Sequence, residues 1–427
     1  MLRKICSLMV TCALIISGLL LFSYINCGSS SDVGSNVNKN LSVYKTENFK
    51  NINKTDLYTL EMTFGSEKTV SNDDFLLVLP GHVLVNEIGD VILTDEGRIK
   101  VFDKQGKEKI IIGGIGEGPS EFITQPLIKI SPKGFLTAYE PGDTRNSYYS
   151  IFDPDYNFVN KKQYRCIPIL EDYLKNKNLK PENIKYITGI LSLDSTSIVY
   201  ELHLENEENG SFRLLLYENE STLVPLHYTK IKGDIRHGRY SYGTWNLGLV
   251  FWNILPVNKI IYIDNNEDVY YNEKEGEYTI NIVSIYGQRY KKIKRRFIPK
   301  KISESAIESV DDRIRNIFPG GKGLNFEIFR RKVINKYKEK QYYPAVQGII
   351  IDNNFVFIEL GHFDEKQNIL TDIYDLDTDT FVGSLYLPME ISTANCINNG
   401  YSYDIGLDEE GFYVVKKYKL QPAVYGK

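Results

Sequence analysis

The feature that most constrains this chain is a succession of short apolar segments, separated by turn residues, that begins at residue 57 and runs almost to the end. Apolar and polar residues alternate within the segments, and turns recur about every 8–12 residues, which is typical of an all-β sandwich, barrel or propeller. The clearest unit has strands predicted at 89–95, 98–103 and 108–112, with a glycine turn before the third strand. This order predicts the inner part of a propeller blade.

Further units of this kind follow along the chain. They occupy residues 135–156, 186–228, 259–285, 348–387 and 391–418. The last unit supplies only three strands, and residues 57–64 are placed to add a fourth from the other end, which would close a ring and remove exposed sheet edges. The 31 tyrosines and 20 phenylalanines suit half-buried strands. The sequence therefore predicts an all-β protein, a β-propeller of about six four-stranded blades over residues 55–420.

One motif adds a family resemblance. Residues 112–122 read Ile-Gly-Gly-Ile-Gly-Glu-Gly-Pro-Ser-Glu-Phe. This stretch resembles the Gly-Pro-x-Glu-Phe signature of bacterial six-bladed β-propeller lipoproteins related to NHL-repeat proteins, in which it joins one blade's outer strand to the next blade. Those proteins also tend to carry a helical insertion followed by Tyr-Pro, as at Tyr343-Pro344. The resemblance covers most of residues 55–420 and implies a fold more than a function.

Helical insertions interrupt the strand pattern in two places. A short helix is predicted at 169–177 and a longer insertion at about 302–340. Within the longer one, Ser305 and Glu308 have the spacing of a capping box. Two apolar sets then recur at helical spacing: Ile307, Val310, Ile314 and Ile317, followed by Phe326, Phe329, Val333 and Tyr337. We expect these helices to pack against the side of the propeller.

The first residues predict export. Arg3 and Lys4 precede an apolar stretch at 8–22, which is the layout of a secretory signal peptide over residues 1–26. Cys27 follows at the position where a bacterial lipoprotein carries its lipidated cysteine. The alternative is cleavage by an ordinary signal peptidase nearby.

Residues 27–54 are rich in Ser, Asn and Lys, so we expect a flexible tether. A lipid on Cys27 would then anchor the protein in the bacterial cell envelope, with the membrane as its partner. The formal net charge of −4 argues against a nucleic-acid partner, which would call for a basic footprint. We expect a monomer. In the exported protein Cys166 and Cys396 either pair or stay as two thiols.

Aromatic residues gather in one segment and suggest a ligand site, since flat rings stack on glycans and peptides at low entropic cost. The candidates are Tyr240, Tyr242, Trp245 and Trp252. Filling the core between blades explains them equally well. The first functional hypothesis is therefore a tethered binding or scaffold module for a protein, peptide or glycan, without a cofactor.

The alternative hypothesis is a metal-dependent propeller hydrolase or lyase, similar to a lactonase. Its divalent metal would lie in the central channel, held by His82, His203 and His362. None of these histidines stands in a local ligand motif. The glycine-rich stretch at 113–118 precedes a proline and not a helix, so we expect no phosphate site there. The acidic stretch at 375–379 lacks the glycine and glutamate of a calcium loop and is expected to form a turn.

Overall fold

A computed structural model places most of the chain. It describes residues 57–140, 148–163, 168–206, 210–230, 234–237, 240–243, 250–264, 276–318, 320–339, 342–343, 345–364, 366, 368–388, 391 and 396–426. The predicted signal peptide, the tether and Cys27 lie outside these residues. No helix within them is both long enough and apolar enough to cross a membrane.

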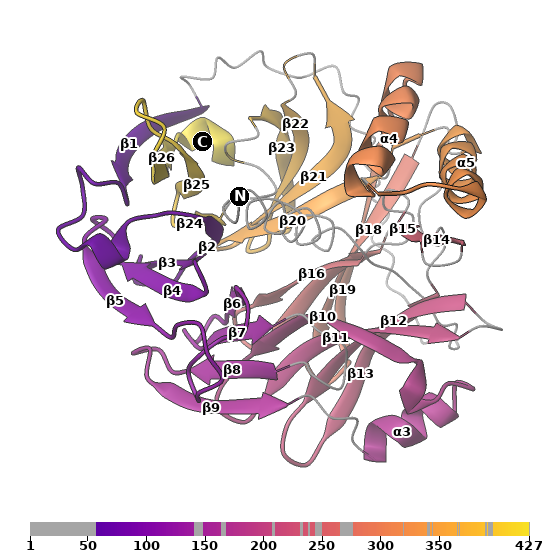
Figure 1. Ribbon diagram of the computed structural model, residues 1–427, viewed down its shortest axis with the longest axis horizontal. Coiled ribbons are helices and arrows are strands. Elements are labelled where there is room, and N and C mark those ends of the chain that lie inside the picture. Colours follow the sequence, from indigo (N-terminus) through magenta and orange to yellow (C-terminus); the bar gives the residue numbers. More distant parts are fainter. Residues whose placement is uncertain are drawn as a thin grey trace.

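Six antiparallel four-stranded sheets stand side by side around a common centre and form a β-propeller, which confirms the predicted fold (Figure 1). Blade 1 holds β2 (Pro80–Val85), β3 (Val91–Asp95), β4 (Arg98–Phe102) and β5 (Glu108–Ile112). Blade 2 holds β6 (Leu127–Ile130), β7 (Leu136–Glu140), β8 (Tyr148–Phe152) and β9 (Phe158–Gln163). Blade 3 holds β10 (Ile184–Ser192), β11 (Ile198–Asn206), β12 (Gly210–Glu218) and β13 (Leu223–Lys230).

The second half of the ring repeats this order. Blade 4 holds β16 (Val250–Leu255), β17 (Lys259–Asp264), β18 (Gly276–Ser284) and β19 (Arg289–Phe297). Blade 5 holds β20 (Val346–Asp352), β21 (Phe355–Phe363), β22 (Ile369–Asp375) and β23 (Thr380–Leu387). Blade 6 holds β24 (Cys396–Asn398), β25 (Tyr401–Leu407), β26 (Tyr413–Leu420) and β1 (Tyr58–Phe64). The first strand named in blades 1 to 6 is the innermost, and most neighbouring innermost strands contact one another.

The two ends of the chain meet in blade 6 and close the ring. β1 pairs antiparallel with β26, from Tyr58 opposite Leu420 to Phe64 opposite Val415. Phe64 is buried at 3% exposure and packs 5.2 Å from the ring of Phe102 in blade 1. The predicted closing strand at 57–64 is therefore confirmed, and it joins blade 6 by hydrogen bonds and blade 1 by packing.

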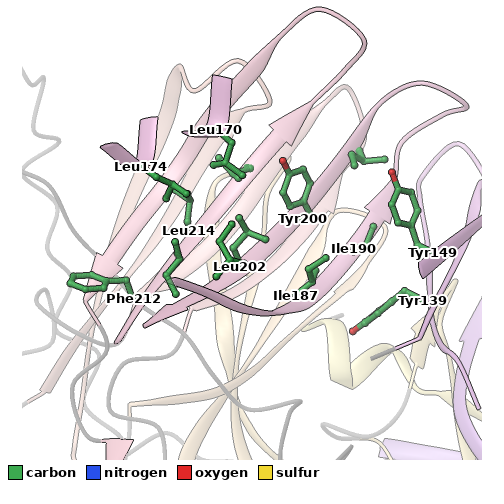
Figure 2. Close-up of a cluster of buried hydrophobic side chains, with 14 of the residues drawn as sticks. Tyr139, Tyr149, Leu170, Leu174, Ile187, Ile190, Tyr200, Leu202, Phe212 and Leu214 are labelled. Atoms are coloured by element: carbon green, nitrogen blue, oxygen red, sulfur yellow. The ribbon is translucent and has the colours of Figure 1, made fainter. Parts of the chain in front are cut away.

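The hydrophobic core is divided among the blade interfaces. Within the described residues, each of the six interfaces holds its own apolar cluster. Side chains alternate along a strand, so a central strand feeds two clusters: Ile92 faces blade 2, while Val91 and Leu93 face blade 6. The cluster between blades 2 and 3 includes Tyr139 of β7, Ile187 of β10 and Leu202 of β11 (Figure 2). Stacking of this kind explains why β3 is buried along its whole length.

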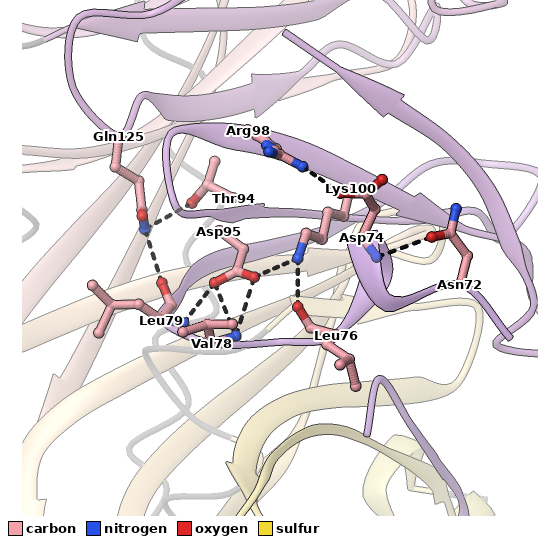
Figure 3. Close-up of polar contacts among 10 residues, drawn as sticks. All are labelled: Asn72, Asp74, Leu76, Val78, Leu79, Thr94, Asp95, Arg98, Lys100 and Gln125. Carbon is pink, nitrogen blue, oxygen red and sulfur yellow. Dashed lines mark hydrogen bonds and ion pairs between the residues drawn. The ribbon is translucent and has the colours of Figure 1, made fainter. Parts of the chain in front are cut away.

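Carboxylates at the ends of second strands fix the chain as it enters each of the first two blades. In blade 1, Asp95 accepts hydrogen bonds from the amides of Val78 and Leu79, at 3.2 and 2.6 Å, and pairs with the Lys100 ammonium at 2.7 Å (Figure 3). Both ionised side chains are buried, at 0% and 2% exposure. Glu140 repeats this role in blade 2, where it accepts hydrogen bonds from two backbone amides.

The glycine-rich motif forms the predicted link between β5 and β6. Gly113 has a φ of +74° and lies against Phe122, which is fully buried. The Glu121 carboxylate accepts a hydrogen bond from the Gly118 amide at 2.8 Å, and a Cβ at Gly116 would collide with it. Since this carboxylate occupies the loop, an anionic phosphate is excluded from it.

The helices confirm both predicted insertions. They are α3 (Pro168–Lys175), α4 (Glu304–Ile317) and α5 (Leu324–Glu339), with short 3₁₀ helices η2 (Asp73–Phe75), η3 (Pro181–Asn183) and η5 (Pro422–Tyr425). The predicted cap at Ser305 is wrong, because Ser303 caps α4 by accepting a hydrogen bond from the Ala306 amide at 3.1 Å. Leu170 and Leu174 of α3 join the cluster between blades 2 and 3.

The α4–α5 pair has its own small core. Val310 and Ile314 of α4 are fully buried against Phe329 and Val333 of α5. α5 contacts a two-stranded sheet of β14 (Asp234–His237) and β15 (Tyr240–Gly243), a hairpin between blades 3 and 4 that the sequence did not predict. The α4–α5 pair therefore packs on this two-stranded insertion through α5. We had expected it to pack against the blades.

We predict that Asp95→Ala destabilises the fold by about 3–5 kcal/mol, because it leaves the Lys100 ammonium buried without its counter-charge. The double variant Asp95→Ala/Lys100→Met should recover much of this loss. Denaturant unfolding measures both. As a control, Asp74→Ala removes an exposed pair with Arg98 and should have little effect. A loss below about 1 kcal/mol for Asp95→Ala would contradict this account.

Candidate functional site

The interface between blades 3 and 4 holds a group of buried charged and titratable side chains. Glu201 on β11 and Arg213 on β12 are only 5% and 4% exposed. His203 on β11 is 1% exposed, and its Nε2 lies 3.4 Å from Glu205 Oε1. Buried ionisable groups seldom stabilise a fold in proportion to their desolvation cost. Their concentration here marks a candidate site.

Strand register places these groups on the side of blade 3 that faces blade 4. Residues directly opposite in an antiparallel pair share a face, and alternate residues along a strand do so too. Glu201 and Leu215 are opposite each other, and Leu215 packs in the cluster shared with blade 4. Arg213, two residues from Leu215, therefore lies on that same face. Gly189 on β10 is opposite Glu201 and contributes no side chain, which leaves room on the axial side.

Trp252 connects this interface to the ring centre. It lies on β16, the innermost strand of blade 4, and its indole Nε1 donates a hydrogen bond to Glu201 Oε2 at 3.3 Å. The other carboxylate oxygen of Glu201 lies 4.0 Å from Arg213 Nη1. The Glu201 carboxylate is therefore held between the indole and the guanidinium.

Lys129 approaches the same indole from blade 2. Its ammonium lies 3.8 Å from the centre of the Trp252 ring, a close cation–π contact. A Cβ on Gly189 would lie 3.3 Å from both side chains, so the glycine in blade 3 allows blades 2 and 4 to meet across it. Burial lowers the pKa of Lys129 to about 8, although the charge of Glu201 opposes the shift.

His82 completes this group from blade 1. It lies on β2, and its pKa is lowered by burial first and then by the charge of Lys129. His82, Lys129, Gly189 and Trp252 thus come from the innermost strands of four consecutive blades. The three side chains are half-buried, so solvent reaches each of them. We call His82, Lys129, Glu201, Arg213 and Trp252 the axial cluster.

The three histidines of the metal hypothesis are not brought together. His82 is on an innermost strand, whereas His203 and His362 lie on the second strands of blades 3 and 5. Nowhere in the described part of the chain do three His, Cys, Asp or Glu side chains gather as a metal site. Burial and Lys300 lower the pKa of His362. Lys129 thus acts on His82, and Lys300 acts on His362. Each positive charge opposes the binding of a divalent cation at that histidine.

Of the predicted ligand residues, Trp252 is the one whose side chain the structure places. Tyr240 and Tyr242 belong to β15 by their backbone, and Trp245 lies outside the described residues. Cys166 also lies outside them. Cys396 has a free thiol, and burial raises its pKa to about 12, so it is an unreactive group at neutral pH.

Two other charged stretches take structural roles. Asp375 accepts a hydrogen bond from the Asp377 amide at 2.9 Å, so the acidic stretch forms the expected turn between β22 and β23. Basic residues are dense on β19, the outermost strand of blade 4, where Lys294 pairs with Glu277 at 2.6 Å. Arg295 turns inward and bonds the buried Asp372 at 3.2 Å, tying blade 4 to blade 5.

Sequence reasoning missed Lys129, Glu201 and Arg213. A signal was present, because Lys129 stands between two isoleucines. Glu201 likewise interrupts an apolar strand. Its pairing with Gly189 recurs in blade 5, where Gly348 is opposite Glu359. A charged residue opposite a glycine at the inner edge of a blade marks such positions.

Comparisons with known proteins return structures of low similarity. No protein-family model and no curated protein matches the chain. A protein described as exported, from Bacteroides fragilis, has 10% identity and a TM-score of 0.46, with 87% of this chain and 98% of that chain covered. A gluconolactonase of Xanthomonas campestris has 6% identity and a TM-score of 0.38 over 85% and 98% of the two chains. A protein of unknown function from Bacteroides caccae has 12% identity and a TM-score of 0.33 over 72% and 81%.

We predict that Lys129→Met stabilises the protein by about 0.5–2 kcal/mol near neutral pH. The lowered pKa of Lys129 means that the folded protein holds this proton more weakly than the unfolded chain does. Wild-type stability should therefore rise relative to the variant between about pH 8 and pH 10.5, where only the unfolded chain is protonated. Denaturant unfolding at about pH 7 and about pH 10 tests this. A variant less stable at neutral pH would contradict it.

Proposed function

We propose that this protein is an exported, membrane-tethered lipoprotein of the bacterial cell envelope that binds a peptide, protein or glycan at the axial cluster. The propeller serves as a rigid frame, and residues 27–54 serve as the tether from a lipid on Cys27. The resemblance to propeller lipoproteins supports the proposed location in the cell envelope. Catalysis is not part of the proposal.

The observation that carries the binding role is the meeting of Lys129, Glu201 and Trp252 from three blades. These groups combine a partly exposed aromatic ring and a partly exposed cation with a buried carboxylate. Binding sites for small ligands commonly pair an aromatic surface with a few fixed polar groups. Burying these polar groups on folding costs desolvation free energy. A role in recognition therefore explains their presence better than a role in folding.

The contacts also fix the geometry of the site. The Arg213 guanidinium and the Trp252 indole hold the Glu201 carboxylate from two sides. A ligand would therefore meet groups that are already oriented, and less entropy would be lost on binding. The lactonase-like alternative receives less support, because the histidines it requires are apart and Lys129 faces His82.

We predict that Trp252→Ala and Glu201→Gln each weaken ligand binding by about tenfold or more, since both residues lie at the centre of the site. Glycan and peptide arrays probed with the purified body, residues 55–427, would identify ligands, and titration would then measure the variants. Tyr290→Ala and Glu220→Gln, both at exposed positions, are the matched controls. Ligands that bind all four variants equally would place recognition elsewhere.

For the address, we predict that Cys27→Ser moves the protein from the membrane fraction to the soluble fraction, because a lipidated cysteine supplies the anchor. Fractionation and mass spectrometry of the mature N-terminus check this in an expressing bacterium. Ser29→Ala in the tether is the control and should stay with the membrane. A Cys27→Ser protein that remains membrane-bound would refute lipid anchoring at this residue.

A further inference from the structure

Lys129 differs from the other enclosed lysines of the propeller in what surrounds its ammonium. Lys100 has Asp95 at 2.7 Å, Lys161 has the Glu121 carbonyl at 2.7 Å, and Lys417 has the Lys104 carbonyl at 3.3 Å. Within the described residues, Lys129 makes neither a hydrogen bond nor an ion pair, and its close contact is the Trp252 ring. Its ammonium therefore keeps all three hydrogens for another acceptor.

The nearby carboxylate does not fill that role. Glu201 acts on Lys129 through its charge, but its two oxygens are directed to Trp252 and Arg213. His82 is held in its neutral form by burial and by Lys129, so it adds a hydrogen-bond donor without adding charge. With His82 neutral, Lys129 and Arg213 against Glu201 leave the axial cluster with one net positive charge.

We infer that the ligand carries an anionic oxygen group, a carboxylate or a phosphate, which binds the Lys129 ammonium beside the Trp252 indole. This inference rests on the proposed function and specifies the class of ligand. An anion would complete the hydrogen bonding of Lys129 and offset its desolvation, as charge-assisted bonds do. The cation–π contact holds the ammonium in position before the ligand arrives.

The chain provides a reporter at the site itself. It has two tryptophans, Trp245 and Trp252. In a Trp245→Phe background, the fluorescence of Trp252 responds to the charge and the contacts of Lys129. Among the described residues, His82 on β2 and Glu201 on β11 interact with Lys129, and Tyr139 on β7 interacts with Glu201, so each probe is compared at one fixed pH.

The test titrates Trp245→Phe protein with D-glucuronate, D-glucose 6-phosphate and D-glucose. The inference expects one or both anionic sugars to bind about 10- to 100-fold more tightly than glucose. Glucuronate and glucose 6-phosphate distinguish a carboxylate from a phosphate. Lys129→Met should remove this preference, whereas Lys133→Met, which changes an exposed lysine paired with Asp194, should retain it.

A second measurement applies if neither sugar fits the site sterically. Inorganic phosphate or acetate should raise the pH midpoint at which Trp252 emission follows deprotonation of Lys129. If no anion moves that midpoint, or if Lys129→Met leaves anion preference unchanged, the inference is overturned. A neutral ligand that depends on Trp252 but not on Lys129 would overturn it while leaving the proposed function in place. If substitution of Trp252 left the affinity of every ligand unchanged, the proposed function would be contradicted.

Discussion

The rest of the structure depends on the pairing of β1 with β26. Each blade buries its two faces only against its neighbours, so a ring that is open at one place exposes two apolar surfaces. β1 closes that place in two ways, by hydrogen bonds to blade 6 and by the burial of Phe64 in blade 1. The closed ring in turn brings residues far apart in sequence, such as His82 and Trp252, to one centre.

Much of this architecture could be predicted from the sequence, because each blade is specified by residues that lie close together in the chain. Alternating apolar residues and turn glycines specify each strand, and the three-strand last unit indicates that residues 57–64 must complete it. The axial cluster could not be predicted in the same way. Lys129 and Trp252 are 123 positions apart along the chain. Their contact depends on the rotation between blades and on the missing side chain of Gly189, neither of which leaves a local pattern.

The axial cluster also shows how the ring separates stability from recognition. Charge is also buried between blades 4 and 5, where Arg295 pairs with Asp372. The interface between blades 3 and 4 adds the buried side chains of Glu201, His203 and Arg213, and the ring centre accepts a lysine whose pKa is lowered. A frame that is stable elsewhere can tolerate this cost. The positions of these desolvated charged groups identify the candidate site.

The most direct test of this account is whether ring closure and the axial cluster form a single cooperative unit. In the Trp245→Phe protein, denaturant unfolding can be followed both by Trp252 fluorescence and by hydrogen exchange of the β1 amides. The account predicts the same midpoint for both signals, because opening β1 releases the blades that hold Trp252 in place. If β1 opened at a lower denaturant concentration while Trp252 emission stayed native, the cluster would not depend on the closed ring.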